Sequence, residues 1–320
     1  MTSTMNAPSA VKPLYASASR AALLGLVVNL ALGATKLVGG IFGNSFALIS
    51  DAVNSIGDSF SSVVVLFGLH VAQRPADSEH PYGHTRAEAV ASLSVALLIA
   101  FSALLVGWEA VVLLRAEPSL PSAWTLWIAG ANVLLKESLY RFNLRIGRRT
   151  NSQAVVANAW DHRSDALCSL AVLIGIALVC WGGPTFARAD GVAALVVVVL
   201  ILWAAGRLFY VSASLLLDHQ AEPEMVDEIR QVAGEVPGVR GVETLWVRRS
   251  GLEFFADIHI EVDPTISVAD GHHISHLVKD QLIDHFAALR DVLVHLEPHP
   301  HTHEFSPSAG APQRDARQDS

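Results

Sequence analysis

The stretch Asn158-Ala-Trp-Asp161-His-Arg-Ser-Asp165 runs without a break into the apolar segment Ala166-Leu-Cys-Ser-Leu-Ala-Val-Leu-Ile-Gly-Ile-Ala-Leu-Val179. Residues four apart lie on one face of an α-helix, so Asp161 and Asp165 are expected to point toward the same spot, with Asn158 one turn before them. A charged side chain in the middle of a bilayer costs about 2.5 to 3.5 kcal/mol on insertion scales. The stretch therefore predicts a membrane-spanning helix whose carboxylates receive a cation.

A second polar group interrupts another apolar run upstream, and it comprises Asp51, Asn54, Ser55 and Asp58. Three or four buried carboxylates without compensation would cost about 10 kcal/mol. We therefore interpret the two runs as helices that place their polar residues around one divalent cation.

The proposed ligands of this cation are four oxygen-bearing side chains, Asn54, Asp58, Asp161 and Asp165. Zinc prefers nitrogen and sulfur donors, whereas oxygen-rich sites suit manganese, magnesium or calcium and tolerate ferrous iron. The structural alternative is that the acids cap helices or pair with buried bases, of which Arg163 is close in the sequence.

The composition is that of a membrane protein. Of the 320 residues, 52% are hydrophobic and 16% are charged, and the mean hydropathy is +0.40. A net charge of -8 and a pI of about 5.9 argue against a nucleic-acid partner. The sequence has no His-Glu-x-x-His, Gly-x-Ser-x-Gly or P-loop motif. We therefore expect neither an enzyme nor a bound cofactor, and any uphill transport would use an ion gradient.

Six apolar stretches are long enough to cross a bilayer, for which about 20 residues are needed. Turn residues separate them, including Gly147 between the fourth and the fifth. The stretches are Ala21–Phe42, Phe46–Val71, Ala87–Leu114, Trp124–Ile146, Gln153–Trp181 and Gly191–Leu217.

The distribution of lysine and arginine predicts that both termini are cytoplasmic, in an inner or plasma membrane. The loops of the other side carry only Arg115 and Arg188. On the side of the termini lie Lys12, Arg20, Arg74, Arg86, Arg141, Arg145, Arg148 and Arg149.

After Asp218 the pattern becomes that of a small soluble domain in the order α-β-β-α-β. Its elements are expected at Pro223–Val236, Val242–Arg249, Phe254–Val262, Val268–Phe286 and Asp291–Leu296. We expect a cytoplasmic segment at 1–19, a transport domain at 20–218, a cytoplasmic domain at 219–300 and a disordered tail at 301–320.

Two further groups of residues could hold metal ions. Asp77, His80 and His84 are spread over one short loop, and this spacing can close on a metal, although solvated histidines would look the same. In the cytoplasmic part, strand alternation places residues of ligand type on common faces, which suggests a regulatory site. These residues are Asp257, His259, Glu261, His295 and Glu297, with His272, His273 and His276 on one helix.

Over about residues 15 to 300 the chain resembles the cation diffusion facilitator family, membrane transporters that export divalent metals against protons. The motifs that carry the resemblance are Ser45-Phe-Ala-Leu-Ile-Ser-Asp51-Ala-Val-Asn54-Ser-Ile-Gly-Asp58, Asp77 through His80-Pro-Tyr-Gly-His84-x-Arg86-x-Glu88, Asp161-His-Arg-Ser-Asp165 and Leu216-Leu-Asp218. The resemblance implies a six-helix membrane domain, a cytoplasmic ferredoxin-like domain and a homodimer in the lipid bilayer.

By this resemblance the transport site falls on Asn54, Asp58, Asp161 and Asp165, and the loop site falls on Asp77, His80 and His84. Zinc-type members usually have histidine in the transport site. Its absence here resembles the manganese branch, with iron-associated relatives next. The remaining assignments are a cytoplasmic site at His259, His272, His295 and Glu297, with Glu243 where histidine is frequent, and a charge interlock at the dimer centre between Arg86 and Asp218.

The leading hypothesis is a proton-coupled exporter with manganese favoured and iron second. The alternatives are an exporter of the zinc, cobalt or nickel type, a membrane scaffold that binds metal without transport and, more distantly, a metal-dependent hydrolase within the membrane.

Overall fold

The computed structural model describes residues 11–42, 46–115, 125–182 and 189–300. The chain divides into two compact units. The first comprises residues 1–221 together with 248–255 and 287–290, and the second comprises residues 222–247, 256–286 and 291–320.

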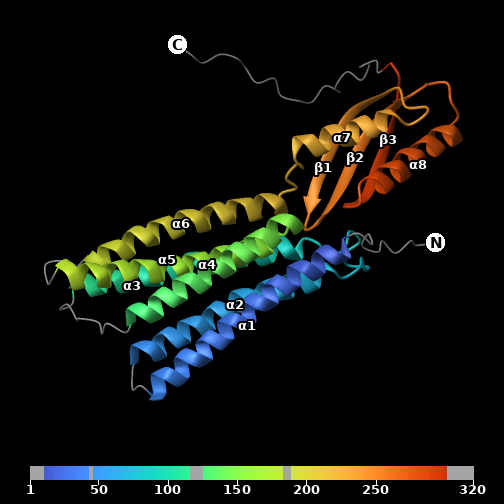
Figure 1. The fold of residues 1–320 in the computed structure, drawn as a ribbon. Coiled ribbons are helices and arrows are strands. Elements are labelled where there is room, and N and C mark those ends of the chain that lie inside the picture. Colours follow the sequence, from blue (N-terminus) through green and yellow to red (C-terminus); the bar gives the residue numbers. More distant parts are fainter. Residues whose placement is uncertain (1–10, 43–45, 116–124, 183–188, 301–320) are drawn as a thin grey trace, which may run out of the picture. The chain divides into compact units, whose positions relative to one another are not determined.

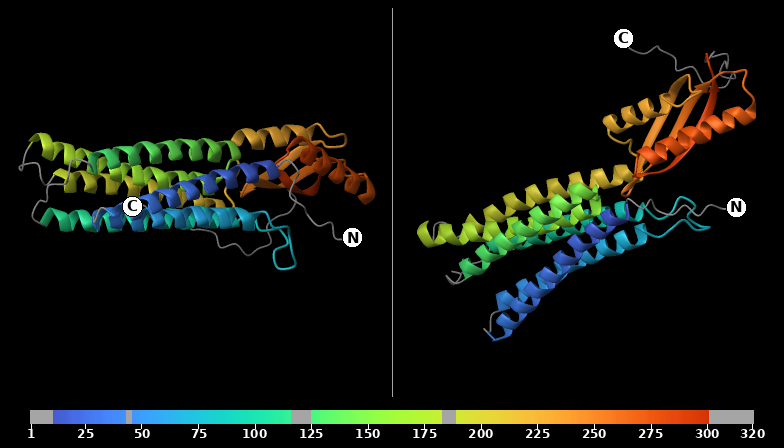
Figure 2. Two further views of the ribbon diagram at one scale, coloured as in Figure 1. Left: turned by 60° about the horizontal axis from the view of Figure 1, so that its bottom comes forward. Right: turned by 45° about the vertical axis from the view of Figure 1, so that its right-hand side comes forward.

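The first unit contains the long helices of the described chain, as the sequence predicts (Figure 1). Three pairs of these helices lie side by side, namely α1 with α2, α3 with α6 and α4 with α5 (Figure 2). Their bounds are α1 Lys12–Phe42, α2 Phe46–Ala72, α3 Ala87–Arg115, α4 Thr125–Thr150, α5 Gln153–Gly182 and α6 Ala189–Leu216.

Helix α1 begins at Lys12, nine residues before the predicted start at Ala21. Val11, Tyr15 and Ala18 are each at most 1% exposed and belong to the hydrophobic core of the first unit. Their spacing of four and three residues forms an apolar face on a helix. The sequence interpretation was wrong here because it weighed the polar composition of this segment rather than its period.

Gly147 lies inside α4, although the sequence predicts a turn at this glycine. A Cβ atom at this position would lie 2.9 Å from Cγ2 of Val156 in α5, so the glycine lets the two helices approach each other. The chain turns instead at Asn151, which has a positive φ of 56°. Asparagine tolerates this conformation better than most residues.

Within the described residues, three stretches combine high hydropathy with a length that spans a membrane, and they are Lys12–Thr35, Ala87–Val112 and Leu195–Leu216. Buried polar residues interrupt the apolar sequence of α4 and α5, among them Lys136, Asn158 and Asp161. Asn158 and Asp161 lie on α5, one of the two helices expected to form the transport site.

The second unit has the predicted order α7 Pro223–Gly234, β1 Gly241–Ser250, β2 Glu253–Val262, α8 Val268–His285 and β3 Leu289–Pro298. Strand β2 lies between β1 and β3. A tight turn at Gly251 joins β1 to β2, and hydrogen bonds from Phe254 to Ala288 and from His299 to Val262 make β2 and β3 parallel. Helix α8 provides the connection that parallel strands require.

The tip of the β1–β2 hairpin, residues 248–255, belongs to the first unit. Leu252 is 3% exposed and part of the same hydrophobic core as α1 and α3. Glu253 accepts a 2.6 Å hydrogen bond from the guanidinium of Arg290, and both side chains are buried. Burial raises the pKa of Glu253, while the hydrogen bond and charge of Arg290 act in the opposite direction.

Breaking this buried pair should destabilise the protein strongly. Glu253→Gln leaves the Arg290 charge buried without a carboxylate, a change that costs about 3 to 5 kcal/mol in comparable pairs. We expect a clear fall in the thermal unfolding midpoint of the purified protein. Arg240→Gln, which removes the exposed 3.9 Å pair of Arg240 with Asp263, is the control and should leave the midpoint unchanged. Equal midpoints for the two variants would contradict the assignment.

Candidate metal sites

Helices α2 and α5 place Asp58 and Asp165 around one positively charged atom. This atom is Nζ of Lys136 in α4, which lies 3.0 Å from Oδ2 of Asp58 and 2.7 Å from Oδ2 of Asp165. It also donates a 3.0 Å hydrogen bond to Oδ1 of Asn29 in α1. The lysine side chain is 1% exposed. The two predicted ligands are thus brought together, and a buried cationic side chain lies between them.

Asp161 is buried one turn before Asp165 and interacts electrostatically with Asp58, Asp165 and Lys136. Its Oδ2 atom has no hydrogen-bond partner in the described part of the chain. An unpaired carboxylate oxygen in such a setting is available to a cation. The side chain of Asn54 lies outside the described residues, so its role as a fourth ligand stays a prediction.

Lys136 is the residue that the sequence interpretation missed. The signal was present, because Lys136 and Glu137 interrupt the apolar run Trp124–Ile146. An ionisable residue within a membrane segment indicates a functional site by default.

The structural alternative, in which the acids pair with a buried base, is seen for Asp58 and Asp165, but the base is Lys136 and the suggestion of Arg163 is wrong. The Arg163 guanidinium lies 4.0 Å from Glu137 and 4.4 Å from the centre of the Tyr140 ring. The charge partner of the acids comes from α4 instead, because Arg163 lies on another face of α5 than Asp161 and Asp165.

Asn158 and His162 complete the polar interior of α5. Asn158 is fully buried and accepts a 2.9 Å hydrogen bond from Ser62 of α2. The ring nitrogens of His162 have no hydrogen-bond partner among the described residues. A Cβ atom on Gly25 would lie 2.8 Å from Nε2 of His162, so α1 passes directly against this ring.

The loop between α2 and α3 brings Asp77, His80 and His84 together. Their ligand atoms lie within 4.8 Å of one another. Oδ1 of Asp77 lies 3.2 Å from Nδ1 of His80, and Oδ2 lies 3.4 Å from Nε2 of His84. The arrangement offers one carboxylate and two imidazoles, a donor set that suits several divalent transition metals.

The backbone of this loop fixes the carboxylate of Asp77. The amide groups of His80 and Glu79 donate hydrogen bonds of 2.7 and 3.0 Å to its Oδ1 atom. The bond from the His80 amide is the largest of the effects that lower the pKa of Asp77. A carboxylate held in its charged form is the form that binds metal.

In the second unit, β2 and β3 bring together His259, His295 and Glu297. Oε1 of Glu297 lies 3.4 Å from Nδ1 of His259 and 3.0 Å from Nε2 of His295, and the ligand atoms lie within 4.8 Å of one another. Because β2 and β3 are parallel neighbours, residues far apart in the sequence meet on one face of the sheet.

The predicted His272 is not part of this group. Its ring packs against that of His276 on α8, with the ring centres 4.6 Å apart. Glu243 in β1 also lies outside the group. Glu261 is 2.6 Å from Nδ1 of His299. The described residues therefore place three of the four predicted cytoplasmic ligands together.

Arg86 and Asp218, the residues of the expected interlock, form an ion pair within the first unit. Asp218 has a positive φ of 57° and also lies 3.9 Å from Nε of Arg248.

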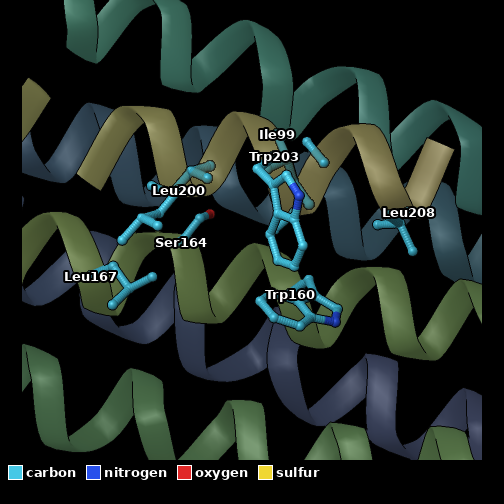
Figure 3. A pocket seen from close by; sticks show the side chains of 10 residues that line it. Ile99, Trp160, Ser164, Leu167, Leu200, Trp203 and Leu208 are labelled. Carbon is cyan, nitrogen blue, oxygen red and sulfur yellow. The ribbon is translucent and has the colours of Figure 1, made fainter. Parts of the chain in front are cut away.

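A cavity of about 120 Å³ lies among α3, α5 and α6 and is lined by apolar side chains such as Ile99, Leu167 and Leu200 (Figure 3). The indole rings of Trp160 and Trp203 also line it. Its polar contribution is the hydroxyl group of Ser164, which donates to the backbone oxygen of Asp161. The described residues of the lining include no carboxylate, histidine or cysteine, which are the usual metal ligands.

Comparison with known proteins covers nearly the whole chain. The cation efflux transmembrane domain matches residues 22–217, and the cytoplasmic domain of cation efflux proteins matches residues 221–299. The manganese efflux system protein MneS of Bacillus subtilis is 31% identical over 87% of this chain and 94% of its own length. The magnetosome protein MamB of Magnetospira is 30% identical over 85% of this chain and 92% of its own length.

Among solved structures, a variant of the MamM CTD matches with 33% sequence identity and a TM-score of 0.23. The match covers 23% of this chain and 93% of the MamM CTD chain. The two family matches account for both the helical part and the α-β-β-α-β part of the chain. The chain therefore belongs to the cation efflux family of membrane transporters.

Proposed function

We propose that the protein exports divalent metal cations from the cytoplasm in exchange for protons, with manganese favoured and ferrous iron second. The observation that carries this proposal is the convergence of Asp58, Asp161 and Asp165 inside the helix bundle. Buried carboxylates bind a cation strongly when they are charged and weakly when they are protonated. Alternating access of the site to the two sides of the membrane would therefore couple metal release to proton uptake.

The preference for manganese and iron is supported by the donor atoms. The three acids supply only oxygen, and Asn54 would add a fourth oxygen ligand. Oxygen donors suit manganese better than zinc. Two relatives named as manganese efflux system proteins support manganese as the favoured metal.

We further propose a homodimer with both termini in the cytoplasm, and domain boundaries at residues 19, 218 and 300. In this dimer the ion pair of Arg86 with Asp218 would lie at the dimer centre and stabilise the chain there. Light scattering of the purified protein measures the dimer directly, and a monomeric mass would contradict it.

Asp161→Asn should abolish manganese transport, because it removes charge from the site while it conserves shape. Proton-dependent manganese uptake into proteoliposomes is the measurement. Glu137→Gln is the matched control, since it removes one acid from α4 that pairs with Arg141 rather than with the site. Normal flux in the Asp161→Asn variant would refute the site. A protein that binds manganese but shows no proton-dependent flux in its unmodified form would be a scaffold.

Asp161→His should move the selectivity from manganese toward zinc, because an imidazole nitrogen is a better zinc ligand than a carboxylate oxygen. Transport of manganese, iron, zinc, cobalt and nickel is compared for this variant and for the unmodified protein. A variant with unchanged ratios would show that the oxygen donors do not set the preference. Higher zinc than manganese transport in the unmodified protein would favour the zinc-type alternative.

The cytoplasmic group formed by His259, His295 and Glu297 should bind a metal that regulates transport. His295→Ala is expected to remove one bound metal per chain, whereas His272→Ala should not, because His272 packs against His276 instead. The metal content of the dialysed full-length variants distinguishes the two. Loss of a metal in the His272→Ala variant would mean that α8 contributes a ligand after all.

A further inference from the structure

Lys136 has an unusual position for a residue of a cation-transport site. Its ammonium group carries three hydrogens. In the part of the chain that the structure describes, three hydrogen-bond acceptors surround it, namely Asn29 at 3.0 Å, Asp58 at 3.0 Å and Asp165 at 2.7 Å. With the side chain 1% exposed, no water is needed to complete these contacts. The lysine therefore satisfies the two acids as a bound cation would.

A divalent metal needs the same oxygen atoms. Zinc–carboxylate bonds are about 2.0 to 2.2 Å long, so a metal ion of this size must contact the carboxylate oxygens directly. A metal bound to both Asp58 and Asp165 would therefore meet Nζ of Lys136 at close range, and the two positive charges would repel each other. The metal can bind both carboxylates only if Nζ leaves at least one of them.

Asn29 can still accept a hydrogen bond from the ammonium group after the metal has displaced it from the carboxylates. Its Oδ1 atom already accepts a hydrogen bond from Nζ, and it is the neutral member of the three acceptors. Because the Asn29 side chain is neutral, the entering metal does not compete with the ammonium group for it by attraction between charges. A small movement of Nζ toward α1 would free the carboxylates while the lysine keeps one hydrogen bond.

The formal charges of the site are consistent with displacement of the lysine by a divalent metal. With the three acids ionised, Lys136 reduces the charge of the site from -3 to -2, which one divalent cation balances. Without the lysine, the occupied site would keep one negative charge and would hold its metal more tightly.

We propose that Lys136 acts as a tethered cation, meaning that its ammonium group binds Asp58 and Asp165 in place of a metal ion between transport events. The entering metal displaces this ammonium group. The lysine acts as a positioning residue that lowers metal affinity and thereby permits release. This inference rests on the proposed transport site, and it adds a competitor for that site within the same chain.

The test is manganese binding by the full-length protein, measured by calorimetry. Variants are made in a His80→Ala, His295→Ala background, so that the loop and cytoplasmic groups do not contribute heat. Lys136→Met should bind manganese about tenfold more tightly or better, because a unit charge a few ångströms away is lost. Its transport turnover should fall, since release becomes slower. Lys136→Arg keeps the charge and should bind with an affinity close to that of the background protein.

Arg163→Met is the matched control. It removes a positive charge two residues from both Asp161 and Asp165, but this guanidinium faces Glu137 and Tyr140. Its manganese affinity should not change. Lys136→Gln covers the case in which the Met variant does not fold, because the amide can still donate a hydrogen bond to a carboxylate. A larger thermal stabilisation by manganese in Lys136→Met and Lys136→Gln than in the background protein and in Lys136→Arg is the second expected result.

The outcomes separate the two proposals. The proposal of a tethered cation is overturned if Lys136→Met and Lys136→Gln bind manganese no more tightly than the background protein. If Asp161→Asn also loses binding, the proposed transport site still stands. Full binding by Asp161→Asn overturns the site itself. If Lys136→Met and Arg163→Met gain equally in manganese affinity, the gain reflects a general effect of positive charge. This result would also overturn the proposal that the metal displaces Lys136.

Discussion

A charged carboxylate buried among apolar helices is costly unless a positive charge or hydrogen-bond donors compensate it, because neither lipid nor apolar side chains replace the water that it has lost. In the described chain the positive charge comes from Lys136, which contacts Asp58 and Asp165 together. The hydrogen bond to Asn29 adds α1 to the contact, so that four helices meet at one nitrogen atom. The packing of α1, α2, α4 and α5 is therefore determined by charge as well as by shape.

Small residues allow the helices to approach each other around this contact. Gly25 leaves room for the buried ring of His162, and Gly147 leaves room for Val156 where α4 meets α5. A methyl group at either position would come within 3.0 Å of its neighbour. Close packing of this kind excludes water and strengthens the electrostatic interactions inside the bundle.

The two outer groups of metal ligands differ in how far they depend on the fold. Asp77, His80 and His84 lie within one loop, and amide groups of that loop bind the carboxylate directly. Their spacing was therefore enough to predict that they come together. His259 and His295 meet because β2 and β3 are parallel neighbours. Alternation indicates which face each residue occupies, but strand pairing decides which residues become neighbours.

The number and order of the helices and strands, the acid pairs on α2 and α5 and the loop group follow from the sequence, because they depend on periodicity and on residues close together in the chain. The tertiary structure alone decided that Lys136 rather than Arg163 meets the acids and that His272 lies apart from the cytoplasmic group. Periodicity gives the direction of a side chain from its own helix. Its partner depends on which helices pack together, and that packing brings together residues far apart in the chain.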